Sequence, residues 1–235
     1  MSQAAAQSPQ QTPKMQLLEA ILMHVPFDGW SQAAFNAAIR DTELAPGLAK
    51  STCPRGAVDL AVAFHQMGDA SMVKSLRSAS LADMKIREKV TFAVRTRLEA
   101  ITDKEAVRRA TTLFALPHLA ADGAKLLWGT SNLIWDTIGD TSDDLNWYTK
   151  RATLSGVYGA TVLFWLGDDA PDHQATWDFL DRRIENVMQI EKAKAQVREA
   201  PGLSKLLAGP NWLASKIKAP TKFRAPDLPG GFGGL

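Results

Sequence analysis

Histidine and aspartate recur four residues apart in this 235-residue chain, a spacing that can place both side chains on one face of a helix. On a shared face such a pair can ligate a metal ion or act as general acid and base. A proline or glycine lies within or beside each pair, which predicts a helix break and separated side chains. Since the chain also lacks a His-Glu-x-x-His motif, we expect no metal site. The four pairs are His24 and Asp28, His65 and Asp69, His118 and Asp122, and Asp169 and His173.

The other residues with catalytic potential lack the neighbours that they need. Ser51 and Cys53 have no nearby base in the sequence to activate them as nucleophiles. No Gly-x-x-x-x-Gly-Lys string is present to hold a phosphate. Asp140, Asp143 and Asp144 lack the glycine and the terminal glutamate of a calcium loop, and helix capping explains them better. We therefore predict a protein that is not an enzyme, with no catalytic residue and no cofactor.

The stretch 139–151 is the most unusual in the chain, because a polar turn leads directly into two large aromatics and two cations. The serine and aspartates of the turn are suited to cap the N-terminus of a helix. Trp147 and Tyr148 follow at consecutive positions, which point about 100° apart on a helix and cannot face one core equally well. At least one ring is expected near the surface as a contact site. The alternative is a capped helix with one core and one boundary aromatic.

Helical periodicity dominates the chain, and strand alternation is missing. Prolines and glycines separate the helical segments, and Gly139 ends one of them. The predicted fold class is all-α, with about ten helices and no sheet. The expected helices span residues 15–25, 32–40, 46–50, 54–66, 81–101, 103–119, 121–138, 145–166 and 172–199, with a short amphipathic piece after Pro201.

The order of these helices predicts a small head followed by a larger body. It resembles the TetR family of regulators, in which a DNA-reading head precedes a ligand-binding body. Residues 27–60, however, carry three cations and four anions, a net charge of −1 that does not suit binding to phosphates. We expect a degenerate helix-turn-helix head that binds no nucleic acid. The predicted divisions are 1–14, a disordered N-terminus; 15–68, the head; 69–200, the body; 201–219, an amphipathic membrane-contact helix; and 220–235, a disordered tail.

The helices of the body carry many large apolar residues, which usually means burial in a bundle. Gly129, Gly156 and Gly159 interrupt these apolar faces. Small residues opposite large ones can leave a cavity for an apolar ligand, so the sequence favours a bound lipid. The residues expected to line that cavity are Phe114, Leu127, Trp128, Val157, Val162 and Phe164.

Positive charge is concentrated near the C-terminus. Residues 192–224 carry eight Lys or Arg and one Glu, a net of +7, whereas the whole chain has +2. A basic segment with apolar residues among its cations is typical of binding to an anionic membrane surface, although an ordinary docked helix is the alternative. The expected membrane contacts are Leu203, Leu206, Leu207, Trp212, Leu213 and Ile217.

The cellular location follows from what the sequence lacks. Cys53 is the single cysteine, so no intramolecular disulfide can form, and a reducing compartment fits. The first 14 residues have no apolar segment of the secretory type, and no apolar run reaches the ~20 residues of a membrane-spanning helix. We expect a cytoplasmic protein, peripheral on the inner face of a bacterial cytoplasmic membrane.

The segment 135–183 contains Gly139-Asp140, the run Asn146 to Arg151 and Thr176-Trp177. With these motifs it closely resembles the Coq-nine proteins of ubiquinone biosynthesis. Their pattern has Gly-Asp, then Ser, Asp and Asn-Trp-Tyr-Thr with a basic pair, a Tyr further on, and Pro-Asp followed by Thr-Trp and Phe-Leu. The chain departs from it at Leu145, where an aromatic is usual, and at Ala170 and His173, which often are Ser and an aromatic. The head agrees more weakly. The matching residues are Gly139, Asp140, Ser142, Asp144, Asn146 to Arg151, Tyr158, Pro171, Asp172, Thr176, Trp177, Phe179, Leu180 and Arg183.

The resemblance implies a TetR-like homodimer that holds isoprenoid quinone precursors or other lipids at a membrane. It further implies that the lipid is presented to the di-iron hydroxylase that acts on demethoxyubiquinone. Two rival interpretations remain, a TetR-type ligand-responsive transcription regulator and a membrane-recruitment scaffold without a lipid cavity. The surface implied for the hydroxylase consists of Ile134, Asp144, Trp147, Tyr148 and Arg151.

Overall fold

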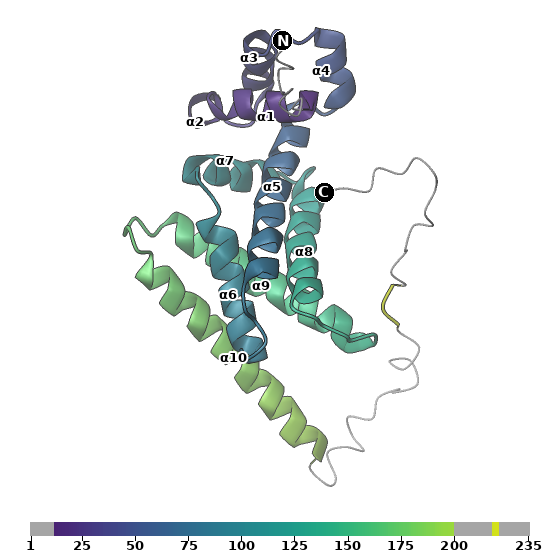
Figure 1. The fold of residues 1–235 in the computed structure, drawn as a ribbon, viewed down its shortest axis with the longest axis vertical. Helices are drawn as coiled ribbons and strands as arrows, with labels where there is room; N and C mark the ends of the chain where they lie inside the picture. The colour runs from purple at the N-terminus through teal and green to yellow at the C-terminus, as the bar shows by residue number, and fades with distance from the viewer. Residues whose placement is uncertain (1–11, 200–217, 221–235) are drawn as a thin grey trace, which may run out of the picture.

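The computed structural model describes residues 12–199 and 218–220, with side chains described through residue 190 and again at 218–220. Within these residues the chain forms ten α-helices and no strand, which confirms the predicted all-α fold class. Figure 1 shows the short helices of the N-terminal part grouped at one end and a long helix running from them into the rest of the molecule. This arrangement is the predicted head followed by a body.

The head consists of four short helices. Ser31 caps the third by accepting a hydrogen bond from the Ala34 N–H at 3.2 Å. The helix expected over residues 15–25 is interrupted at Met23 and His24, because Pro26 is better placed in the first turn of a new helix than inside an old one. The bounds are α1, Pro13–Leu22; α2, Val25–Asp28; α3, Gln32–Asp41; and α4, Pro46–Thr52.

The fifth helix, α5 (Ala57–Ser78), joins the head to the body without a break. The expected end at residue 66 is wrong, because the helix continues through Gly68. At this position a Cβ would lie 2.5 Å from Nη1 of Arg97, so the guanidinium occupies the space that a side chain would need. The expected boundary between residues 68 and 69 therefore falls inside a helix.

The body consists of five helices around the lower part of α5. The helix α9 begins and ends at the residues expected, whereas α6 starts later than residue 81 because α5 reaches Ser78. In Figure 1, α10 crosses the molecule along α6 and α9, and it packs against both. The bounds are α6, Ile86–Glu99; α7, Lys104–Phe114; α8, Ala120–Thr137; α9, Leu145–Leu166; and α10, Gln174–Glu199.

Two hydrophobic cores meet along α5. Phe64 belongs to the core of the head, and Met72, two turns later, belongs to the core of the body. Two side chains also fasten the head to α7. Nε1 of Trp30 donates to the Ala106 carbonyl at 3.0 Å, and Nη2 of Arg109 donates to the Pro26 carbonyl at 2.8 Å. The body thus holds the head from two sides, through α5 and α7.

Candidate functional site

The turn between α8 and α9 has the geometry that its unusual sequence suggested. Gly139 follows α8 with a φ of 88°, in the left-handed region that glycine adopts at little cost. The Asp140 N–H donates to the Trp135 carbonyl at 2.9 Å, which closes the turn. Asp144 then caps α9, accepting from the Asn146 N–H at 2.9 Å. Gly139 therefore ends one helix and Asp144 begins the next, as predicted.

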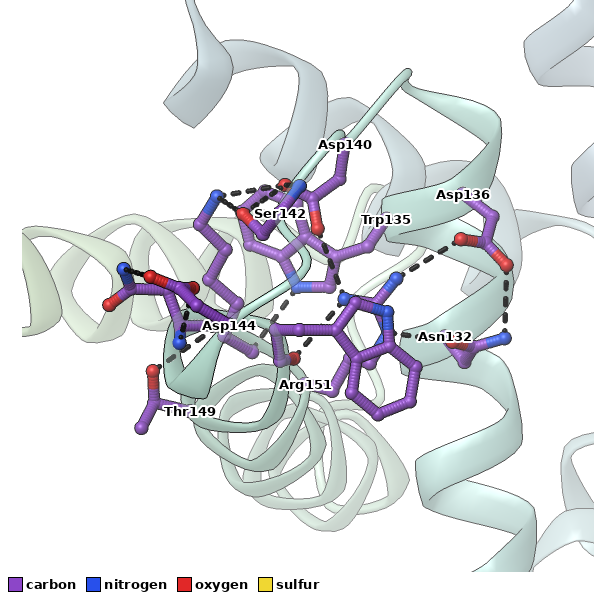
Figure 2. A network of polar contacts seen from close by, with 11 residues as sticks. Asn132, Trp135, Asp136, Asp140, Ser142, Asp144, Thr149 and Arg151 are labelled. Atoms are coloured by element: carbon purple, nitrogen blue, oxygen red, sulfur yellow. Dashed lines mark hydrogen bonds and ion pairs between the residues drawn. The ribbon is translucent and has the colours of Figure 1, made fainter. Parts of the chain in front are cut away.

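Arg151 ties this turn to both helices from a fully buried position. Its Nε donates to Asn132 Oδ1 at 2.6 Å, its Nη1 to Asp140 Oδ2 at 3.0 Å, and its Nη2 to Asp136 Oδ1 at 3.0 Å. Figure 2 shows the guanidinium at the centre of this network, between α8 and the turn. A buried guanidinium is strongly desolvated, and the ion pairs with two carboxylates together with the hydrogen bond to Asn132 offset that penalty.

Asp140 is the anionic centre of the turn. Besides Arg151, it accepts from Nζ of Lys150 at 2.8 Å and from the Ser142 hydroxyl at 2.9 Å. Burial alone would raise the pKa of Asp140, but the hydrogen bonds from Lys150, Ser142 and Arg151 outweigh it and lower the pKa to about 2. The expectation that Asp140 is a helix cap is wrong, because its side chain pairs with cations instead.

Three rings beside this network form what we call the aromatic surface: Trp128, Trp147 and Tyr148. The Trp147 and Tyr148 rings meet edge to face with centroids 4.8 Å apart, and Trp128 lies 5.9 Å from Trp147. The Arg151 guanidinium lies 4.1 Å from the centroid of the Trp147 ring. All three residues are half-buried, so each keeps part of its surface in contact with solvent. The expected aromatic exposure is confirmed for both members of the adjacent pair.

Three of the five residues assigned to the hydroxylase surface reach the outside. Asp144 is exposed, and Trp147 and Tyr148 are half-buried. Ile134 and Arg151 have 0% exposure, because Ile134 belongs to the core of the body and Arg151 to the polar network. The assignment of these two residues to the surface is wrong: Ile134 is buried in the core, and Arg151 lies beneath the Trp147 ring, so neither is open to a partner.

A short C-terminal segment, residues 218–220, lies against the start of α9. The Ala219 N–H donates to the Asp143 carbonyl at 2.8 Å, and the Tyr148 hydroxyl donates to the Lys218 carbonyl at 3.2 Å. This segment of the chain thus contacts the aromatic surface. The six residues expected to contact the membrane lie outside the described residues: Leu203, Leu206, Leu207, Trp212, Leu213 and Ile217.

A cavity of about 540 Å³ lies among α5, α7, α8, α9 and the end of α6. Of the six residues expected to line a lipid cavity, Phe114, Leu127 and Val162 do line this one. The other three point elsewhere, since neighbouring helical positions are rotated by about 100°. Trp128 belongs to the aromatic surface, Val157 packs on the core of the body, and Phe164 stacks on Phe179 with centroids 4.5 Å apart.

The two most deeply buried residues of the cavity wall, Arg97 and Tyr158, are polar. Together with the half-buried His65 they form what we call the polar floor, which Asp69 and Thr130 support. Nε of Arg97 donates to Asp69 Oδ1 at 2.6 Å. The Thr130 hydroxyl lies 3.0 Å and 3.1 Å from the two Asp69 oxygens and 2.8 Å from Nε2 of His65. These contacts join α5, α6 and α8 beneath an otherwise apolar space.

Two residues of the polar floor are held neutral. Burial lowers the pKa of His65 to about 4, against the opposing attraction of Asp69. Burial also raises the pKa of Tyr158 to about 12. At neutral pH the floor therefore carries one positive charge, on Arg97, and one negative charge, on Asp69.

The sequence contained a signal for the polar floor that we misinterpreted. His65 and Asp69 were set aside because Gly68 lies between them, but α5 is continuous, and Nε2 of His65 lies 3.5 Å from Oδ2 of Asp69. Arg97, near the C-terminal end of α6, is only 3% exposed. His24, by contrast, pairs with Asp41 at 2.6 Å and not with Asp28.

Neither a metal-binding cluster nor a membrane-spanning helix occurs among the described residues. Nowhere in 12–190 or 218–220 do three or more His, Cys, Asp or Glu side chains gather as a metal site would require. None of the helices in the described part of the chain combines the length and apolarity needed to cross a bilayer.

Comparison with known proteins gives one family and one fold. Residues 120–191 match the family model described as COQ9. The mitochondrial ubiquinone biosynthesis protein COQ9 of Bos taurus is 30% identical over 190 residues, which cover 77% of this chain and 59% of that protein. COQ9-A of Xenopus laevis is 31% identical over 192 residues, 78% of this chain and 60% of that protein. The matches thus span about three fifths of these relatives' lengths.

Among solved structures, a TetR transcriptional regulator from Nitrosomonas europaea superposes with a TM-score of 0.61 at 16% sequence identity. The likeness covers 73% of this chain and 95% of the regulator. At so low an identity it establishes a TetR-like fold and carries no argument about activity.

Proposed function

Through residues 120–191 this chain belongs to the COQ9 family, and from that premise we propose that it is a lipid-binding accessory protein of ubiquinone biosynthesis. In this proposal it binds an isoprenoid quinone precursor at the membrane and presents it to the di-iron demethoxyubiquinone hydroxylase. It carries the lipid as a ligand and performs no catalytic step itself. The observation that carries the proposal is the cavity.

The size and lining of the cavity suit an isoprenoid. Its volume of about 540 Å³ lies within the roughly 300–1,000 Å³ of small-molecule sites. Apolar side chains form most of the wall, and the lining residues Met67 and Leu163 are 37% and 61% exposed, so they mark a rim open to solvent. A long isoprenoid tail can pass out over this rim while the inner part of the lipid stays enclosed.

The aromatic surface is the proposed docking place for the hydroxylase. Half-exposed Trp and Tyr side chains are frequent anchors of protein interfaces. Successive residues of α8 also connect the two sites, since Leu127 lines the cavity and Trp128 lies on the aromatic surface. A partner that contacts Trp128 would therefore sit close to the wall of the lipid cavity.

Three parts of the proposal rest on the sequence and the family alone. They are membrane contact through residues 203–217, a peripheral location on the inner face of a bacterial cytoplasmic membrane, and assembly as a homodimer. The relatives are named as mitochondrial proteins, and a peripheral attachment suits the use of a membrane-embedded precursor in either setting. The basic and apolar composition of the C-terminal segment supports the attachment.

The rival function, a ligand-responsive transcription regulator, draws support from the fold alone. The head has three cations between residues 27 and 60, and Arg55 is already paired with Asp59 at 2.8 Å and with Asp122 at 3.0 Å. Two cations remain for phosphate contacts, which is a weak basis for DNA affinity.

The decisive experiment is lipid extraction from the purified full chain after expression in a host that makes ubiquinone. We expect an isoprenoid lipid in the extract, identified by mass spectrometry. Gly156 and Gly129 provide a matched pair, because a Cβ at either meets nothing within 4 Å but only Gly156 lines the cavity. Gly156→Leu should therefore lose the lipid and Gly129→Leu should keep it. An extract free of lipid would favour the scaffold, and salt-sensitive binding of duplex DNA would favour the regulator.

A further inference from the structure

We propose that the polar floor binds the head group of the lipid and selects a neutral head that carries oxygen acceptors. The lipid then lies head first in the cavity, with its tail toward the rim. This inference rests on the proposed function, since it requires that the cavity holds a lipid, and it adds which end enters and what chemistry that end has.

The position of the polar floor fixes the orientation. Arg97 and Tyr158 are 3% and 2% exposed, whereas Met67 and Leu163 at the rim are 37% and 61% exposed. The polar side chains thus lie at the inner end of an apolar passage. A hydrocarbon tail placed against the floor would leave Nη1 of Arg97 without water and without a partner, which is unfavourable. An oxygen-bearing head in the same place satisfies this donor.

Arg97 provides the donor that such a head needs. Its Nε donates to Asp69, and its Nη2 donates to the His65 carbonyl at 3.0 Å. Nη1 has no hydrogen-bond partner among the described residues, and it lies over Gly68, which also lines the cavity. The absence of a side chain at Gly68 makes room for the guanidinium at this point. A carbonyl or hydroxyl oxygen of the ligand can accept from Nη1.

Tyr158 contributes a second polar group to the floor. Its hydroxyl group stays protonated at neutral pH, because burial raises its pKa to about 12. The phenol oxygen can accept from a hydroxyl of the ligand, and the ring forms part of the wall. Arg97 and Tyr158 together suit a ring that carries carbonyl or phenolic oxygens.

The charge of the floor selects against anionic heads. Asp69 pairs with Arg97 at 2.6 Å and neutralises it, and His65 carries no charge at neutral pH. The floor therefore has no net positive charge, while a buried phosphate would need strong cationic compensation. A quinone or phenol is neutral and needs only hydrogen bonds. The structure thus favours a quinone-type head over a phosphate or diphosphate head.

The test uses three ligands that share one farnesyl chain: a farnesyl benzoquinone, the hydrocarbon farnesene, and farnesyl phosphate. Their binding to the delipidated full chain is measured by equilibrium dialysis. We expect the quinone to bind about tenfold or more tightly than farnesene, the size of effect that one hydrogen bond to a charged donor gives. Farnesyl phosphate should bind no better than farnesene.

Arg97→Lys is the first variant, because a lysine can keep the ion pair with Asp69 while the Nη1 donor is lost. It should abolish the preference for the quinone and leave farnesene binding unchanged. Tyr158→Phe, a milder change, should reduce the preference several-fold. Thr111→Val is the matched control, since Thr111 lines the cavity from α7 but donates to the Val107 carbonyl of its own helix at 3.0 Å. It should leave the preference intact.

Each outcome decides between the two proposals. Equal binding of quinone and farnesene, or a preference that survives in Tyr158→Phe and Arg97→Lys, would refute head recognition and leave lipid carriage standing. Tighter binding of farnesyl phosphate would refute the neutral head. Failure of all three ligands to bind the unaltered chain would refute the proposed function itself.

Discussion

The guanidinium of Arg151 lies 4.1 Å from the centre of the Trp147 ring. Both residues belong to α9, and Arg151 follows Trp147 by about one helical turn. The contact joins the interior of the molecule to its surface, because Arg151 is fully buried and Trp147 is half-buried. Hydrogen bonds to Asn132, Asp136 and Asp140 hold the cation in place. The orientation of an aromatic ring on the surface is therefore set by a polar network beneath it.

Loss of this buried cation should be strongly destabilising. Arg151→Ala leaves the Asp140 carboxylate, itself 4% exposed, without its buried partner. We expect a decrease of about 3 kcal/mol or more in the free energy of unfolding, measured by urea denaturation. Lys150→Ala is the comparison, since Lys150 binds the same carboxylate but is 38% exposed, and it should lower stability by about 1 kcal/mol or less. Equal losses in the two variants would contradict this account.

Tyr148 is the ring through which a surface role can be measured most cleanly. Tyr148→Ala should weaken binding of the di-iron hydroxylase by about 2 kcal/mol, as truncation of an aromatic anchor does. Its effect on unfolding should be small, because the side chain is half-buried. Isothermal titration with the purified hydroxylase provides the measurement. Tyr148→Phe keeps the ring and loses only the hydrogen bond to the Lys218 carbonyl, so it should bind nearly as well as the unaltered chain.

The neutral state of His65 predicts a pH dependence of stability. The pKa of this residue is lowered from 6.5 to about 4 by burial, so below pH 6.5 the unfolded chain binds a proton that the folded chain does not. The contribution to stability is therefore complete above pH 6.5 and decreases as the pH falls toward 4, by up to about 3 kcal/mol. Denaturation midpoints of His65→Gln should vary less across this window. The opposite charges of Asp69 and Arg97 lie beside position 65 in the unaltered chain and in His65→Gln alike. They therefore do not account for a difference between the two proteins.

Gly68 should not tolerate a methyl group. In Gly68→Ala the new Cβ would lie 2.5 Å from Nη1 and 2.6 Å from Cζ of Arg97, and it would push the guanidinium away from Asp69. We expect a net loss of stability even though alanine favours a helix over glycine by roughly 1 kcal/mol. Gly129→Ala gives the opposite expectation, a small gain in thermal midpoint, because nothing lies within 4 Å of its Cβ. A stabilised Gly68→Ala protein would show that Arg97 moves aside freely.

The C-terminal segment should govern attachment to lipid surfaces. Its cations contribute roughly 1 kcal/mol each near an anionic membrane, and its apolar side chains supply the insertion energy. Deletion from residue 201 onward should abolish sedimentation with anionic liposomes. Replacement of Lys205, Lys216 and Lys218 with Gln should make the residual binding less sensitive to salt. Lipid already in the cavity should remain in both proteins, and full liposome binding after the deletion would show that attachment occurs elsewhere.

Local signals were enough to predict most of the helices, but neither every helix end nor every side-chain environment. Gly139, Asp144 and the apolar run up to Leu166 set the bounds of α9, and they act within a few residues of the helix ends. Gly68 also resembled such an end. This glycine stands inside a helix because it makes room for the side chain of Arg97, 29 positions later in the chain. Nothing in the local sequence indicates that contact.

The candidate sites, too, were predicted where the signal is local and missed where it depends on the packing of the helices. The sequence identified Trp147 and Tyr148 by their adjacency, and it identified an apolar cavity by its glycines, of which Gly156 and Gly159 line the wall. It could not distinguish Leu127 from Trp128, because the direction in which each points depends on the rotation of α8 in the bundle. The polar floor was missed for a similar reason, since its five residues come from four helices.

The continuity of α5 also limits how this chain can change length over evolution. Phe64 packs in one core and Met72 in the other, with eight residues of unbroken helix setting the angle between them. Insertion of one residue here would rotate the two cores by about 100° relative to each other and turn His65 away from Asp69. Insertions in the turn after Gly139 require no such rotation of a core. Variation in length among homologous chains should thus be absent from α5 and concentrated in the surface turns.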